Sequence, residues 1–289
     1  MSEPRQHDVI IAGGGLAGAS LAVGLAGRGF DVAVIEAVDR AADHQPSYDD
    51  RTLVINRASL NILGALGVLD DGLTRCPIRT IEITRAGGFG HVRLDAERHG
   101  VDRFGDVIVA RELGNRLLDT LRTTEGIHEY CPETLETFSV DDDGVAVRLA
   151  SGVQLQGRLL VAADGTGSRI RQAAGMASSL HDYRQSAMIF NVQPAPAARD
   201  TAYERFTPVG PLAFLPQPEG RLGVVWIDAS DAVDAAMDWS DDELLERLRK
   251  RAGAGFVDFQ RPGKRARYPL RLLRTPPPIG LRTVAIGGV

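Results

Sequence analysis

The sequence predicts an α/β fold in which a Rossmann-like domain, a parallel sheet with helices, carries an inserted and mostly antiparallel β domain. Three observations support this expectation. A strand, a glycine-rich turn and a helix open the chain, a second strand–turn–helix pattern follows residue 158, and longer strands with proline-rich joints follow residue 186. The 289 residues suffice for one large domain or two closely built ones.

A βαβ unit is the first element expected. Residues 8–12 are an apolar run typical of a buried strand, residues 16–28 have helical periodicity rich in Ala and Leu, and residues 31–35 alternate as a second strand. The second strand ends on Glu36. An acid at this strand tip can accept hydrogen bonds from an adenosine ribose, so we expect Glu36 to bind that ribose.

Three glycines between the first strand and the helix match G-x-G-x-x-G. Gly13 permits the sharp turn out of the strand, Gly15 lets a pyrophosphate approach the backbone, and Gly18 lets the helix pack close to the sheet. The helix N-terminus, at Leu16 and Ala17, offers free N–H groups and a positive dipole end to the phosphates. This unit does not distinguish FAD from NAD, and its acidic ribose ligand disfavours NADP.

Composition excludes several classes of protein. Charged residues make up 25% of the chain and the net charge is −5, which gives no indication of a nucleic-acid partner. Residues 9–27 carry no charge, but six glycines among them disfavour a transmembrane helix. The polar N-terminus shows no secretory signal, and we expect Cys76 and Cys131 to be reduced thiols of a cytoplasmic protein.

Periodicity and turn residues predict the remaining elements. A helix after Ser240 is expected from its capping box with Glu243. Further helices are expected at residues 59–69 and 112–123, and strands at residues 78–84, 91–95, 145–149, 153–155, 158–163, 187–192, 212–216, 222–227 and 282–286. The last strand is expected to return the chain to the first domain.

The second strand–turn–helix pattern carries the motif that suggests a family. Asp164-Gly165 is a common turn pair and Ser168 a common helix N-cap. With the opening glycine fingerprint, residues 164–171 (DGTGSRIR) resemble the D-G-x-x-S-x-x-R motif of flavin-dependent aromatic hydroxylases. In that family the motif lies near the FAD pyrophosphate and is tied to NAD(P)H use. The resemblance therefore implies an FAD-binding domain with Asp164 and Gly165 at the cofactor.

Two arginines match further family segments. Asp49-Asp50-Arg51 is similar to a D-x-R segment whose arginine lies near the flavin. Arg111-Glu112-Leu113 is similar to an R-x-L segment whose arginine is expected to reach FAD. For each arginine, a solvated surface charge is the alternative.

Later segments resemble the ubiquinone-biosynthesis branch of this family, the 2-octaprenyl-6-methoxyphenol hydroxylase type. They are residues 210–216, 220–221, 224–226 and 268–270. The resemblance covers essentially the whole chain and implies five segments. These are residues 1–75 and 107–180 for the FAD-binding domain, 76–106 and 181–275 for the substrate domain, and 276–289 for the start of the returning strand.

The end of the sequence departs from the family pattern. There the last strand runs into a third flavin motif, Gly-Asp or Gly-Asn, followed by a loop beside the isoalloxazine. Here the sequence reads Gly287-Gly288-Val289, with Gly288 where the Asp or Asn stands. We expect either a C-terminally truncated fragment or a short form with a damaged flavin site.

The resemblance implies an FAD-dependent monooxygenase that hydroxylates a polyprenylated phenol in ubiquinone biosynthesis. NAD(P)H, as co-substrate, would reduce FAD, and O2 would form a flavin C4a-hydroperoxide that attacks the ring. Implied partners are the lipophilic phenol, O2, a ubiquinone-biosynthesis complex and the surface of the inner membrane, without nucleic acid or a transmembrane span. Two alternatives stay open: a flavin reductase or dehydrogenase of the same fold, and a non-catalytic partner in a quinone-biosynthesis complex.

The sequence identifies no catalytic acid or base and no metal site. Its six histidines are scattered without ligand spacing. Leu212, Phe214 and Trp226 alternate on expected strands and line either an apolar substrate surface or the ordinary core of a sheet.

Overall fold

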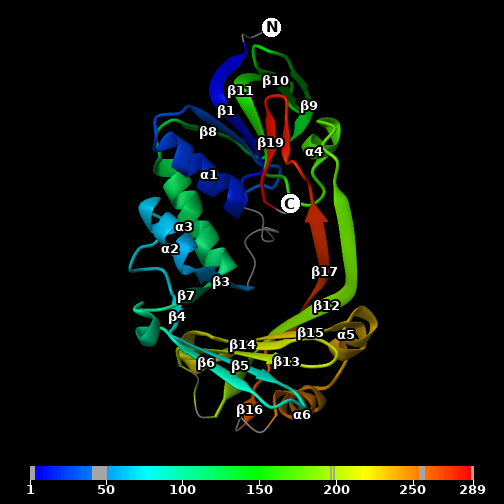
Figure 1. Cartoon of the computed structure of the whole chain (residues 1–289). Coiled ribbons are helices and arrows are strands. Elements are labelled where there is room, and N and C mark those ends of the chain that lie inside the picture. Colours follow the sequence, from blue (N-terminus) through cyan, green and yellow to red (C-terminus); the bar gives the residue numbers. More distant parts are fainter. Residues whose placement is uncertain (1–3, 41–50, 196, 198, 254–257, 288–289) are drawn as a thin grey trace.

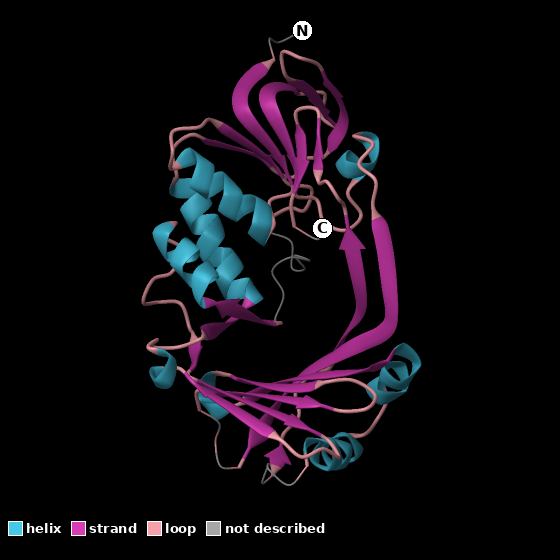
Figure 2. Cartoon of the chain, viewed as in Figure 1, coloured by secondary structure: helices cyan, strands magenta, loops and turns pink. Residues whose placement is uncertain are grey.

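The structure is a computed structural model that describes residues 4–40, 51–195, 197, 199–253 and 258–287. Two eight-stranded sheets lie at opposite ends of the molecule, with a three-stranded sheet and helices along one side between them (Figures 1 and 2). On the other side, the paired strands β12 (Ser179–Pro194) and β17 (Ala266–Arg274) connect the two ends (Figure 1). The predicted fold class is confirmed.

The first sheet has a parallel centre in the order β19-β11-β1-β2-β8. These strands are β1 (Arg5–Ala12), β2 (Val32–Ile35), β8 (Ile127–Tyr130), β11 (Gln154–Ala162) and β19 (Thr283–Ala285). Antiparallel additions are β9 (Leu135–Val140), β10 (Val145–Leu149) and β18 (Ile279–Gly280). The carboxyl ends of β1, β2 and β11 meet at one edge, where open α/β sheets bind ligands.

Helices α1 (Leu16–Ala26) and α3 (Ala110–Thr123) cover one face of this sheet. Val23 and Leu117 of these helices are buried against Ile11 of β1. On the opposite face, the neighbouring residue Ile10 is fully buried in a cluster with residues of β9, β10 and the short helix α4 (Arg169–Ala173). Since both faces are covered, the strand is an uninterrupted apolar run rather than an alternating one.

The three-stranded sheet has the order β3-β7-β4 and lies between the two larger sheets. Its strands are β3 (Thr52–Asn56), β4 (Cys76–Ile78) and β7 (Gly105–Val109). Helix α2 (Arg57–Ala65) begins directly after β3, because the Asn56 side chain accepts a hydrogen bond from the Ser59 N–H at 2.9 Å.

The second large sheet has the order β17-β12-β15-β14-β13-β5-β6, and β16 also pairs with β12. Its other strands are β5 (Thr80–Arg85), β6 (His91–Asp95), β13 (Thr201–Phe206), β14 (Leu212–Pro216), β15 (Leu222–Ala229) and β16 (Phe259–Gln260). Helices α5 (Ser230–Met237) and α6 (Asp241–Ala252) lie on the outer face of this sheet (Figure 1). Ser240 accepts a bond from the Glu243 N–H at 3.2 Å, as the capping box predicts.

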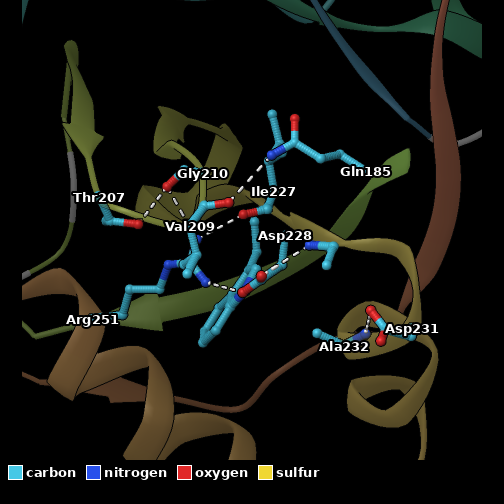
Figure 3. A network of polar contacts seen from close by, with 11 residues as sticks. Gln185, Thr207, Val209, Gly210, Ile227, Asp228, Asp231, Ala232 and Arg251 are labelled. Atoms are coloured by element: carbon cyan, nitrogen blue, oxygen red, sulfur yellow. Dashed lines mark hydrogen bonds and ion pairs between the residues drawn. The ribbon is translucent and has the colours of Figure 1, made fainter. Parts of the chain in front are cut away.

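A partly buried ion pair connects α6 to this sheet (Figure 3). The Arg251 guanidinium donates to the Asp228 carboxylate at 2.6 Å and to the carbonyl oxygens of Ile227 and Gly210. It also lies 4.5 Å from the centre of the Trp226 ring. One side chain therefore connects the helix, β15 and the turn before β14.

Several predicted elements differ from the structure. The strands expected at 153–155 and 158–163 are one continuous strand, β11, because both parts pair with β1 in a single register. The helix expected at 59–69 occupies Arg57–Ala65. Sequence reasoning missed several elements, among them β3, β7, β8, β9, β13, β17 and α5, most of which are short or have mixed polarity.

Of the two alternatives for Leu212, Phe214 and Trp226, the ordinary core of a sheet is confirmed and the apolar substrate surface is wrong. These side chains are at most 5% exposed and pack beneath α5 and α6, and Phe214 stacks on Phe259 with 5.3 Å between ring centres. Alternation identified the strands, but it did not show which face of the sheet the helices cover. Within the described ranges, no helix is both long and apolar enough to cross a membrane.

Candidate dinucleotide site at the sheet edge

The glycine-rich turn after β1 is built around two close approaches. Gly13 has φ +102°, a conformation that disfavours side chains, and an added Cβ would lie 2.6 Å from the carbonyl carbon of Ala163. An added Cβ on Gly18 would overlap the carbonyl oxygen of Gly13. Both glycines are therefore needed for the turn to pack between β1, β11 and α1.

The N-terminus of α1 faces the same edge. Gly15 is its N-cap, and no side chain of the described residues caps it. The first N–H groups of a helix have no partner within it, so those at Leu16, Ala17 and Gly18 are donors for an anion. Leu16 is half-buried and Ala17 is exposed. Gly287 lies beside this turn, since a Cβ there would be 3.1 Å from that of Ala17.

Glu36 lies at the tip of β2, as predicted. Its carboxylate accepts hydrogen bonds from the N–H groups of Gly14 at 2.7 Å and Val38 at 2.8 Å. Each oxygen retains further acceptor capacity for a ribose hydroxyl. Sequence reasoning missed Arg40, which donates to the Gly14 carbonyl at 3.3 Å and pairs with Glu129 at 2.7 Å. No sequence spacing links Arg40 to Gly14 and Glu129, because the three residues meet only in the folded chain.

The Asp164-Gly165 turn follows β11 at the same edge. Gly165 has φ +81°, and the Asp164 side chain accepts a bond from the Arg169 N–H at 3.2 Å. Ser168 caps α4 by accepting from the Arg171 N–H at 3.0 Å. Arg171, at 3% exposure, donates to the carbonyls of Gly165 and of Thr166, the latter at 2.5 Å. Arg171, the last residue of the D-G-x-x-S-x-x-R motif, thus stabilises the Asp164-Gly165 turn through hydrogen bonds from its buried side chain.

One cavity of ≈1250 Å³ joins these features. Among the residues that line it are Gly13, Gly15, Glu36, Arg51, Asp164, Gly165 and Arg169. Arg51 also lies 5.5 Å from the ring centre of Tyr268 in the second sheet. Arg111 is exposed in the first turn of α3 and is not among the residues that line the cavity. Asp49, Asp50, Gly288 and Val289 lie outside the described residues.

The cavity fits an extended dinucleotide. Its volume exceeds the ~300–1,000 Å³ of ordinary ligand pockets. It combines a helix N-terminus for phosphate, a carboxylate for ribose and an arginine between the sheets. The residues present therefore suit FAD, whose pyrophosphate would lie at Gly13–Gly18.

A second polar cluster lies at the opposite, amino end of the same strands. His7 and His128 contact the two oxygens of Asp31 at 2.5 and 3.0 Å, and His7 also contacts the Tyr130 hydroxyl at 3.1 Å. Burial raises the pKa of Asp31, but the hydrogen bonds and charges of both histidines outweigh it and hold this pKa below its ordinary value of 3.8. These two histidines are not scattered, as the sequence suggested, because parallel β1 and β8 begin at the same edge.

The fold and the cavity define a dinucleotide-binding α/β protein with an inserted antiparallel sheet. A family model described as an FAD binding domain matches residues 6–267. The chain belongs to this family, and the resemblance to flavin-dependent hydroxylases of ubiquinone biosynthesis is confirmed.

Two curated relatives carry names from that pathway. The chain is 33% identical over 275 residues to ubiquinone hydroxylase UbiL of Rhodospirillum rubrum, covering 94% of this chain. It is 35% identical over 248 residues to 3-demethoxyubiquinol 3-hydroxylase of Escherichia coli, covering 84% of this chain. The chain spans 63% of the length of each relative.

Solved structures show the same fold at lower identity. PqsL of Pseudomonas aeruginosa, described as a probable FAD-dependent monooxygenase, superposes with a TM-score of 0.79 at 20% identity, covering 98% of this chain and 79% of PqsL. The flavin-dependent monooxygenase PieE, solved with FAD and substrate, gives 0.71 at 16% identity, covering 99% of this chain and 54% of PieE.

Proposed function

We propose that this protein is an FAD-dependent monooxygenase that hydroxylates a lipophilic, polyprenylated phenol in ubiquinone biosynthesis, with NAD(P)H as reductant and O2 as oxidant. The observation that carries the proposal is the cavity in which the glycine turn, Glu36, Arg51 and the Asp164-Gly165 turn meet. The ubiquinone hydroxylases among the relatives support the substrate class.

Each predicted site residue then has a role. Gly13, Gly15 and Gly18, with the N–H groups of Leu16 and Ala17, would receive the FAD pyrophosphate. Glu36 would accept hydrogen bonds from the adenosine ribose. Asp164, Gly165 and Arg51 would face the flavin half, and Arg111 would reach the cofactor from α3. Bound FAD would supply the electron transfer from NAD(P)H and the activation of O2.

The setting of the reaction is part of the proposal. The phenol would bind between the cofactor domain, segments 1–75 and 107–180, and the substrate domain, segments 76–106 and 181–275, with segment 276–289 returning to the cofactor sheet. The protein would act in the cytoplasm, at the surface of the inner membrane and beside other enzymes of ubiquinone biosynthesis, since its substrate is lipophilic.

The test measures cofactor and product together. Purified protein is titrated with FAD by flavin fluorescence, and NAD(P)H oxidation is followed with a prenylated phenol under ¹⁸O2. We expect saturable FAD binding and a product that gains one ¹⁸O atom. A protein that fails to bind FAD, or that reduces a quinone without oxygen transfer, would refute the proposed function.

A further inference from the structure

The second sheet has one face toward the helices and one toward the cofactor domain. Residues such as Phe214 and Trp226 lie under α5 and α6, so their neighbours on each strand point the other way. Three contacts show what that second face meets. Gln217, after β14, donates a hydrogen bond to the Thr52 hydroxyl at 3.4 Å, and Gly223 lies beside that hydroxyl. The ring of Tyr268 lies under the guanidinium of Arg51, which lines the cavity.

A single row of paired residues crosses this second face. The row is Ile83 of β5, Glu204 of β13, Ala213 of β14, Val225 of β15 and Ile189 of β12. Paired residues share a face, so the carboxylate of Glu204 lies in an otherwise apolar row. Glu204 lies on β13, and β15, which carries Val225 and Gly223, is two strands away in the sheet, a distance of about 10 Å.

Glu204 is half-buried and has no hydrogen bond or ion pair with any residue that the structure describes. Arg85, on the neighbouring strand β5, pairs in register with Phe206 and not with Glu204. Burial raises the pKa of Glu204, and no opposite charge offsets this effect. Glu82 of β5 pairs in register with Tyr203, the residue before Glu204, and so lies on the helix face. Its carboxylate is paired with Arg93 at 2.7 Å.

We propose that Glu204 is the polar anchor of the substrate site and accepts a hydrogen bond from the phenolic hydroxyl of the substrate. This inference rests on the proposed function and names a residue for it. The substrate class has an apolar body with a hydroxyl donor, and the row offers an apolar surface with one acceptor. The aromatic ring would pack on Ala213 and Val225, while an ionised carboxylate, which only accepts, would orient the hydroxyl.

The experiment removes the hydrogen bond from either side. FAD-loaded protein is titrated by calorimetry with 2-geranylphenol and with its methyl ether, which cannot donate. The variants are Glu204→Ala, Glu204→Gln and, as a matched control on the opposite face, Glu82→Ala. A hydrogen bond to a charged group corresponds to about 10- to 100-fold in affinity, so the wild type should prefer the phenol by about that factor.

We expect this preference to fall below about threefold in Glu204→Ala, to be intermediate in Glu204→Gln and to persist in Glu82→Ala. Glu204→Gln keeps the shape of the side chain and remains informative if Glu204→Ala does not fold. A preference unchanged by either Glu204 variant, or no binding of the phenol by wild type, overturns the inference. Loss of FAD binding by the wild type instead refutes the proposed function, and flavin fluorescence measures it separately.

Discussion

Gly18 and Gly24 lie in the same helix, α1, but alanine should have opposite effects at the two positions. A Cβ at Gly18 would overlap the Gly13 carbonyl oxygen, with the carbonyl carbon at 3.1 Å and the Ala163 Cβ at 3.2 Å. A Cβ at Gly24 would lie 3.5 Å from Cδ2 of Leu66, which is ordinary van der Waals contact. Comparing the two alanine variants therefore separates two effects on stability: the higher helix propensity of alanine, and the steric overlap of a Cβ with the glycine-rich turn.

The magnitudes follow from these contacts. Replacing glycine by alanine inside a helix stabilises it by about 1 kcal/mol at either position. Overpacking at Gly18 costs about 1–3 kcal/mol, toward the upper end because the atom in the way is backbone. We expect Gly24→Ala to be about 1 kcal/mol more stable than wild type and Gly18→Ala to be up to about 2 kcal/mol less stable. The two variants should then differ in Tm by about 2–12 °C.

Thermal unfolding by circular dichroism, with and without FAD, measures this difference. Because the turn that Gly18 supports is the phosphate-binding one, Gly18→Ala should also weaken FAD binding, while Gly24→Ala should leave it unchanged. A Gly18→Ala protein that melts at or above the Tm of Gly24→Ala, with unaltered FAD affinity, would refute the close-packing argument.

Three other predictions test separate parts of the molecule. Arg171→Met removes the donors that hold the Asp164-Gly165 turn, so FAD affinity measured by flavin fluorescence should fall about tenfold, and an unchanged affinity would contradict the role assigned to this arginine. Asp228→Ala leaves the Arg251 guanidinium without its carboxylate (Figure 3), and urea unfolding should show a loss of about 2 kcal/mol, whereas an unchanged midpoint would show that the ion pair does not stabilise the fold. The raised pKa of Glu204 means that the folded state binds the proton more tightly, so stability falls as pH rises above the ordinary value of 4.5. Glu204→Gln should therefore exceed wild type in Tm at pH 7.5 but not at pH 4, and equal differences at both pH values would count against the burial effect.

The elements predicted best were those in which local rules agree with tertiary structure. The apolar strand, the glycine turn and the helix after it needed only residues close in sequence, and they formed as expected. Strand β8 was missed because Ile127–Tyr130 is short and polar at His128 and Glu129. Its place in the sheet comes from pairing with β2, which no local pattern shows.

The candidate site was predictable only where a motif marks it. Glu36 and Asp164 lie at the cavity because strand tips of a parallel sheet converge there. Arg40 and Glu204 were missed, since their surroundings come from distant segments. Leu212 and Phe214 show the same limit, because alternation identifies a strand but not the face that later helices cover.

The pairing of β1 with β11 has a consequence for biosynthesis of the chain. Arg5 pairs with Leu155, so the phosphate turn after β1 lacks its neighbour until 150 further residues have been made. At ~5–20 residues per second, ribosomes need about 8–30 s for that interval. Throughout it, one edge of an apolar strand stays open to incorrect partners. Lower growth temperature and the supply of chaperones should therefore affect the yield of folded protein more than the choice of codons for the residues of the second sheet.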